Sequence, residues 1–188
     1  LPEDTENNSY GAETTPLKIG NRLYLCSATN QMMALDAATG EEIWHYDPNV
    51  DKNWIPYTAA CRGVVYYESD LDAEAACHAR VIEGTLDGRI IAVDAETGEP
   101  CTDFGQNGEV DIKTGMGDIV PGMVSITSPP SVVSGVIVTN HQVLDGQKLE
   151  APSGVIKGFD VMTGEWLWSW DMTRPDISIA PPEGDYFT

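Results

Sequence analysis

Hydrophobic and polar residues alternate along most of this chain, in short runs separated by turn residues. Residues 22–26, 63–67 and 136–139 are examples, and each run is next to a turn that contains glycine. A period of two residues is typical of β-strands, in which successive side chains point to opposite faces. The pattern favours strands over helices and predicts an all-β protein.

Three stretches repeat almost the same sequence, at residues 34–44, 92–99 and 158–168. In each of them an apolar strand leads into Asp, a Thr-Gly pair follows, and the chain turns back. The Asp can accept backbone N–H groups across the turn, and the Gly supplies the positive φ that the return needs. The spacing between the repeats is long enough for a four-stranded antiparallel unit. Such units in series predict a partial β-propeller of about three blades.

The repeats divide the chain into three expected blades, at residues 10–48, 57–105 and 124–172, with a lead-out at 173–188. Residues 104–123 are rich in glycine and are expected to form a long loop, a kind of segment that is often functional. Because known propellers close with about four to eight blades, we expect the chain to be a piece of a longer protein.

The chain has 10 basic and 30 acidic residues, a formal net charge of -20. This balance argues against a nucleic-acid partner, because phosphate binding needs a basic surface. A solvated acidic surface is the simple interpretation, and an acidic pocket that holds a metal is the alternative. The sequence has no apolar run long enough to span a bilayer.

Four cysteines lack the short paired spacings of a zinc site. Two disulfides with three possible connectivities could form among them. Cys61 and Cys77 are on either side of a loop-like stretch and are the expected pair, with free buried thiols as the alternative. A disulfide would indicate an oxidising compartment such as the periplasm.

The repeat Ala-x-Asp-x-x-x-Gly-Glu-x-x-Trp, complete at 34–44, resembles the tryptophan-docking motif of the PQQ-dependent quinoprotein dehydrogenases. Four further motifs occur in order around the repeats: Glu-Thr-Thr-Pro-Leu at 13–17, Cys-Arg-Gly-Val at 61–64, Thr-Ser-Pro-Pro at 127–130 and Pro-Ser-Gly-Val-Ile at 152–156. Together they are similar to the first blades of the membrane-bound branch, which includes glucose and quinate/shikimate dehydrogenases. The resemblance implies an eight-bladed propeller in which Trp44 and Trp168 pack between blades.

The resemblance also implies a cofactor, PQQ, which is a planar ortho-quinone with three carboxylates. Such a ligand needs cations and N–H donors. Arg62 matches a cofactor-binding arginine, because a guanidinium fork suits carboxylate. Glu13 and Thr127 match a carboxylate and a hydroxyl that bond the cofactor. The alternatives are a surface Arg with a local partner, a solvated Glu and an ordinary strand Thr.

One metal ligand is implied as well. Asp145 matches an acidic ligand of Ca²⁺ or Mg²⁺, cations that prefer oxygen, although an Asp before Gly146 is often only a turn former. The resemblance locates the second metal ligand and the catalytic base beyond residue 188. We therefore expect the isolated chain to be inactive.

Two positions concern the substrate. Glucose dehydrogenases have a histidine where this chain has Thr58, which argues against glucose. The stretches at 57–63 and 140–146 look closer to the quinate/shikimate branch. His141 in the second stretch is a candidate for contact with cofactor or substrate, and a loop histidine with local partners is the alternative.

The leading hypothesis is a fragment of a quinate/shikimate-type dehydrogenase that oxidises a cyclic polyhydroxy acid and passes electrons to a membrane quinone. The intact protein would be periplasmic, anchored in the inner membrane by a segment outside these residues. The first alternative is a PQQ-dependent glucose or polyol dehydrogenase, and the second is a non-enzymatic propeller scaffold. A scaffold has no reason to bring Glu13, Arg62, Thr127 and Asp145 to one end of the blades.

Overall fold

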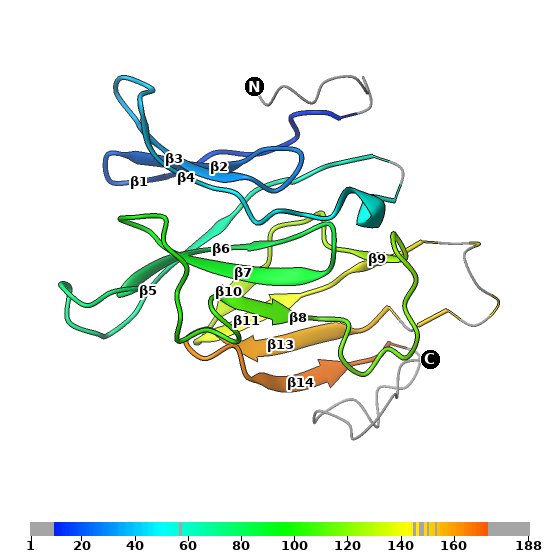
Figure 1. The fold of residues 1–188 in the computed structure, drawn as a ribbon. Helices are drawn as coiled ribbons and strands as arrows, with labels where there is room; N and C mark the ends of the chain where they lie inside the picture. The colour runs from blue at the N-terminus through cyan, green and yellow to red at the C-terminus, as the bar shows by residue number, and fades with distance from the viewer. Residues whose placement is uncertain are drawn as a thin grey trace.

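The computed structural model describes residues 10–56, 58–144, 146, 149, 151–152 and 154–172 of the chain. Three four-stranded antiparallel sheets make up this part, and they lie one above another like an open fan (Figure 1). This arrangement confirms the prediction of an all-β partial propeller with about three blades. In the residues that the structure describes, no helix has the length and apolar character needed to cross a bilayer.

Each four-stranded sheet is one blade. Blade 1 consists of β1 (Leu17–Ile19), β2 (Arg22–Cys26), β3 (Met32–Asp36) and β4 (Glu42–Tyr46). Blade 2 consists of β5 (Val65–Glu68), β6 (Ala79–Gly84), β7 (Arg89–Asp94) and β8 (Glu109–Asp111). Blade 3 consists of β10 (Ser131–Val133), β11 (Val136–Thr139), β13 (Ile156–Asp160) and β14 (Trp166–Trp170). Outside the blades, β9 (Val124–Ser125) pairs with β12 (Gln142–Val143), and the 3-10 helix η1 spans Lys52–Trp54.

The turn after the third strand has the same hydrogen bonds in every blade. In blade 1, Oδ1 of Asp36 accepts the N–H groups of Ala38 and Thr39 at 2.8 Å. Asp94 and Asp160 accept the two equivalent N–H groups in their own blades. The glycine four residues after each Asp has a φ of 76°, 77° or 72°, a conformation that favours glycine. This local chemistry explains why the repeat is visible in the sequence.

Blade 2 lies between two hydrophobic cores. Side chains of β7 alternate between them, because successive residues of a strand point to opposite faces. Ile91 and Val93 pack with Tyr24 in the core toward blade 1. Ile90 packs with Phe159 in the core toward blade 3. Both faces of the central blade are therefore dry, and its position is fixed from both sides.

Trp44 of β4 lies between blades 1 and 2 and is 7% exposed. Its indole Nε1 donates to the carbonyl of Ala95, at 3.0 Å, in the turn of blade 2. The ring lies flat enough on Gly98 that an added Cβ there would be 2.8 Å from its Cδ2 atom. The tryptophan thus joins blade 1 to the repeated turn of blade 2.

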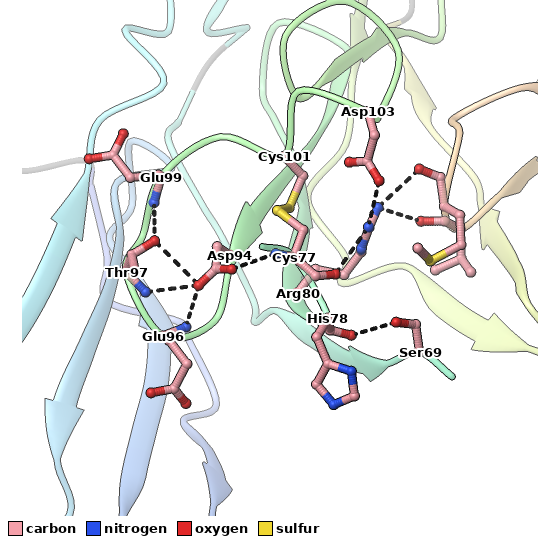
Figure 2. The surroundings of a disulfide bond; sticks show 12 residues. Ser69, Cys77, His78, Arg80, Asp94, Glu96, Thr97, Glu99, Cys101 and Asp103 are labelled. Carbon is pink, nitrogen blue, oxygen red and sulfur yellow. Dashed lines mark hydrogen bonds and ion pairs between the residues drawn. A yellow bond between two sulfur atoms is a disulfide. The ribbon is translucent and has the colours of Figure 1, made fainter. Parts of the chain in front are cut away.

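An arginine makes a parallel contact in two successive blades. Arg22 of β2 donates to the carbonyl of Ala95 at 2.9 Å. Arg80, at the equivalent position of β6, donates to the carbonyls of Val161 and Met162 at 3.2 and 3.0 Å. Arg80 has no exposed surface, and Figure 2 shows that its guanidinium also points toward Asp103, with which it forms an ion pair. The second strands of blades 1 and 2 therefore each contact the turn of the following blade.

The middle repeat lacks a tryptophan, and Phe104 occupies the space instead. Phe104 is fully buried, and a Cβ added to Gly164 in the turn of blade 3 would be 3.3 Å from its ring. The neighbouring Gly105 donates its N–H to the carbonyl of Thr163 at 2.8 Å. Blade 2 is thus docked on blade 3 without an indole.

Trp168 of β14 stacks on its own sheet. A Cβ added to Gly158 on the adjacent strand would be 2.2 Å from the indole ring. The ring is half-buried, and no fourth blade occurs among the described residues. Its packing between blades remains a prediction.

The expected loop at 104–123 contains a strand, so that expectation is wrong in part. β8 pairs with β7 and lies beyond the range 57–105 expected for the second blade. The segment also contributes four fully buried side chains to the core between blades 2 and 3, those of Phe104, Ile112, Met116 and Met123. The strand has a single apolar residue, Val110, and follows a glycine, which is why alternation did not reveal it.

The expected pairing of Cys61 with Cys77 is also wrong. The two disulfides are Cys26–Cys61 and Cys77–Cys101. Cys61 precedes β5 and Cys77 precedes β6, so they lie at opposite ends of the β5–β6 hairpin. The length of β5 alone is about 13 Å, and bridged cysteines need Cα atoms within about 7 Å.

Candidate functional site

Three predicted cofactor residues occupy equivalent places in the three blades. Glu13 and Thr127 stand four residues before β1 and β10, and Arg62 stands three residues before β5. The N–H of Thr15 donates to the carbonyl of Arg62 at 3.0 Å, and the N–H of Arg62 donates to the carbonyl of Thr127 at 3.2 Å. The segments that lead into the first strands are therefore joined side by side, although they are far apart in the sequence.

Arg62 and Glu13 form an ion pair, with Nη2 of Arg62 3.0 Å from Oε2 of Glu13. Both side chains are 46% exposed, so the pair lies at the surface and contributes little to stability by itself. A guanidinium has five N–H donors in one plane. The carboxylate of Glu13 orients this plane without occupying all of its donors, which is suitable for a planar anionic ligand.

Thr127 and His141 come together through the small sheet. Gln142 of β12 pairs with Ser125 of β9, the last pair of this register, and His141 and Ile126 are the next residues of the two segments. His141 is therefore across from the residue that precedes Thr127. Both side chains are half-buried. The segment of Thr127 is in turn joined to Arg62 by a backbone hydrogen bond, and a role for His141 at this site stays a prediction.

Thr58 is among the residues that the structure describes, and Asp145 is not. Thr58 is half-buried and lies four residues before Arg62 on the same connection. Asp145 is outside the described residues, so its metal role stays a prediction. Among the described residues, the groups that could hold a metal are Cys26, Cys61 and Glu83, and Cys77, Cys101 and Asp103. Each group consists of two disulfide sulfurs and one carboxylate, which is too few oxygen ligands for Ca²⁺ or Mg²⁺.

A buried acid beneath this site was not found from the sequence. Glu83 of β6 has no exposed surface. Its Oε2 lies 3.5 Å from Sγ of Cys61, and its Oε1 has no hydrogen-bond partner among the described residues. Burial raises the pKa of Glu83 well above its usual value, and Asn30 and Arg89 lower it by less. A disulfide sulfur has no proton, so a hydrogen bond in this contact needs the neutral carboxyl as donor.

The Glu83→Gln variant is expected to become more stable relative to the wild type as the pH rises. The folded protein keeps a proton on Glu83 that the unfolded chain releases near the usual pKa of 4.5. The free energy of unfolding of the wild type therefore falls as the pH rises from there toward the folded pKa. Glutamine does not ionise, so the variant escapes a loss of about 1.4 kcal/mol per pH unit in this interval.

Denaturant unfolding at about pH 5 and about pH 7.5 measures this difference. Glu42→Gln is the matched control, because Glu42 is an exposed residue of β4 whose loss changes only the surface charge. An equal stability difference between Glu83→Gln and the wild type at both pH values would contradict the buried neutral acid.

The comparison with protein-family models matches residues 1–187 to the family described as "PQQ: Glucose/ethanol/alcohol dehydrogenase, beta-propeller domain". The chain belongs to this family. The match covers nearly the whole length of this PQQ dehydrogenase propeller. It includes the blade-docking turns and the adjoining entry segments described above.

Individual relatives of this PQQ dehydrogenase propeller give a finer comparison. The glycerol dehydrogenase large subunit of Gluconobacter oxydans (strain 621H) is 50% identical over 188 residues, which is all of this chain and 25% of the relative. The quinate/shikimate dehydrogenase (quinone) of Acinetobacter baylyi (strain ATCC 33305 / BD413 / ADP1) is 34% identical over 203 residues, covering 97% of this chain and 25% of the relative. The crystal structure of a quinohemoprotein alcohol dehydrogenase from Comamonas testosteroni has a TM-score of 0.65 and 27% identity, covering 87% of this chain and 21% of that one. The chain spans about a quarter of the length of the curated relatives it matches.

Proposed function

We propose that the full-length protein is a PQQ-dependent dehydrogenase that oxidises a polyol of the glycerol type and passes the electrons to a membrane quinone. The 50% identity to the glycerol dehydrogenase large subunit, over the whole chain, carries the choice of substrate. The quinate-type acid favoured by the short motifs has weaker support, because the quinate/shikimate relative is 34% identical. The polyol alternative therefore replaces it as the leading hypothesis.

The residues on the adjoining entry segments would suit such a cofactor. When bound, PQQ supplies an ortho-quinone that accepts a hydride from the alcohol carbon. Arg62 would bind a cofactor carboxylate through its planar donors, and Glu13 would hold the guanidinium in place. Thr127 would offer a hydroxyl from the neighbouring blade. His141 is across from the residue before Thr127 and would line the same end.

The remaining parts of the proposal concern metal, base and location. Asp145 would provide one oxygen ligand to Ca²⁺ or Mg²⁺, and the catalytic base would belong to further blades of the full-length protein. Two disulfides are typical of proteins in an oxidising compartment. This observation supports a periplasmic location for the propeller, with a membrane anchor elsewhere in the full-length protein.

Substrate ranking of the full-length protein tests the proposal. After reconstitution with PQQ and Ca²⁺ or Mg²⁺, dye reduction is expected to be faster with glycerol than with quinate, compared as kcat/KM. Thr58→His should shift the ratio of glucose to glycerol turnover toward glucose by about tenfold, because one new polar contact in a substrate pocket changes discrimination by this order. The titration of the variant with PQQ should not change.

Thr39→His is the matched control, because Thr39 is exposed in the turn after β3. Its substrate ratio is expected to equal that of the wild type. Faster turnover of quinate than of glycerol by the wild type would return the quinate hypothesis to first place. Dye reduction with none of these substrates would reject the polyol proposal itself.

A further inference from the structure

We propose that the Cys26–Cys61 disulfide positions the predicted cofactor-binding residues Glu13 and Arg62, because it fixes the two backbone segments that carry them. This inference rests on the proposed function for its link to PQQ, and its structural part stands on the contacts alone. Cys61 directly precedes Arg62, and Cys26 is the last residue of β2. The disulfide joins them with a Cα–Cα distance of 6.1 Å.

The disulfide also contacts the segment of Glu13. The Oγ1 atom of Thr14 lies 3.4 Å from Sγ of Cys26 and accepts the N–H of Cys26 at 3.4 Å. Each member of the Glu13–Arg62 ion pair is therefore one residue away from a group held by the disulfide. The backbone bond from Thr15 to Arg62 closes the same small region. The exposed ion pair is thus attached to backbone segments that a buried disulfide holds.

The Cys26–Cys61 disulfide packs against residues of blade 2 and against Asn30. Both cysteines are 2% exposed, and the fully buried Glu83 lies against Cys61. Asn30, also fully buried, donates to the carbonyl of Gly84 at 3.2 Å and accepts the N–H of Leu86 at 2.9 Å. Because these groups leave the sulfurs little room, the disulfide holds the entry segments of blades 1 and 2 in one arrangement. Preorganised binding groups lose less freedom when a ligand binds.

The second disulfide provides a matched control. Cys77–Cys101 closes a loop of similar length, with a sequence separation of 24 compared with 35. It lies beside Arg80 and the turn of Asp94 (Figure 2), at the start of β6, whereas Glu83 and Cys61 are near the end of that strand. Removing either disulfide should have a similar effect on the unfolded chain. The two variants differ in their distance from Arg62.

The first experiment compares Cys26→Ser/Cys61→Ser with Cys77→Ser/Cys101→Ser in the full-length apoprotein. Titration with PQQ is expected to show about tenfold weaker binding for the first variant. The second variant should bind PQQ like the wild type within about twofold. Equal losses in both variants, or no loss in the first, would overturn the positioning role.

The second experiment needs no cofactor. Hydrogen exchange of the amides of Thr15 and Arg62, which donate across the entry segments, should be at least about tenfold faster in Cys26→Ser/Cys61→Ser and unchanged in the control variant. If wild-type protein does not bind PQQ, the proposed function fails, and exchange still decides whether the disulfide positions these segments. Unchanged exchange would reject the inference even where PQQ binds.

A third variant covers the case in which Cys26→Ser/Cys61→Ser does not fold. Thr14→Val keeps the shape of the side chain and the disulfide but removes the oxygen that contacts Cys26. It should accelerate exchange at Thr15 by about threefold and weaken PQQ binding by a similar factor, as expected for one weak hydrogen bond. Wild-type values for both quantities would overturn the inference.

Discussion

Replacing Trp44 with alanine is expected to lower the free energy of unfolding by about 3–5 kcal/mol, the usual cost of removing a large buried aromatic ring. The ring fills the space between blades 1 and 2, stacks on Gly98 and lies 6.0 Å from the ring of Tyr24. Truncation to alanine would leave a cavity in the core between blades 1 and 2. Denaturant unfolding of the full-length protein measures the loss.

Two further variants separate the ring from its hydrogen bond. Trp44→Phe keeps most of the packing and loses the N–H, and it should cost only about 1 kcal/mol. The carbonyl of Ala95 still accepts from Arg22 and from the hydroxyl of Tyr24 in that variant. Trp170→Ala, at an indole that is 41% exposed, should cost less than about 1 kcal/mol. Equal losses for Trp44→Ala and Trp170→Ala would contradict the docking role of Trp44.

Replacing Arg62 with alanine is expected to weaken PQQ binding about tenfold to a hundredfold, because a charge-assisted bond to a carboxylate contributes about 1.5–3 kcal/mol. The discrimination between substrates should change little, since the residue would contact the cofactor. PQQ titration of the apoprotein, together with kcat/KM for glycerol and glucose, distinguishes the two effects. Arg62→Lys should recover only part of the affinity, because an ammonium lacks the planar fork.

Lys18→Ala is the control for net charge. Lys18 is an exposed cation of β1 whose Nζ donates to the carbonyl of Gly20, and its loss removes one positive charge from the same blade as Glu13. PQQ affinity should remain that of the wild type. Wild-type affinity in Arg62→Ala would remove Arg62 from the cofactor site, and a matching loss in Lys18→Ala would show a general effect of charge.

The fold was predictable because its signals are local. An Asp whose oxygen accepts two N–H groups and a Gly with positive φ must lie within one turn, so Asp36 and Gly40 reveal the repeat by themselves. The docking arginines have a weaker signal of the same kind. Arg22 and Arg80 both stand 14 residues before the Asp of their own repeat, and this shared spacing could have identified them.

The features that were missed depend on contacts between distant residues. The direction of the β5–β6 hairpin excludes the Cys61–Cys77 pair, and the sequence spacing of these two residues does not reveal that direction. Glu83 of blade 2 is at the position that Leu25 has in blade 1, by the register of the second and third strands. The sequence signal for this buried acid was therefore only a polar residue within an apolar strand. For the candidate site, motif order predicted residues that the structure brings side by side, but Cys26 and Thr14 became relevant only through their contacts.

The contacts of Trp44, Arg22 and Arg80 all run from one blade to the turn of the blade that follows it in the sequence. During synthesis on the ribosome, blade 1 has an indole and a guanidinium whose acceptor, the carbonyl of Ala95, does not yet exist outside the exit tunnel. Blade 1 can complete its packing only after the third strand of blade 2 has emerged, and Arg80 imposes the same wait on blade 2. Packing of each of these two blades is therefore expected to wait for the blade that follows it, and a pause in translation while Ala95 is still inside the exit tunnel would prolong the exposure of the unfinished face of blade 1.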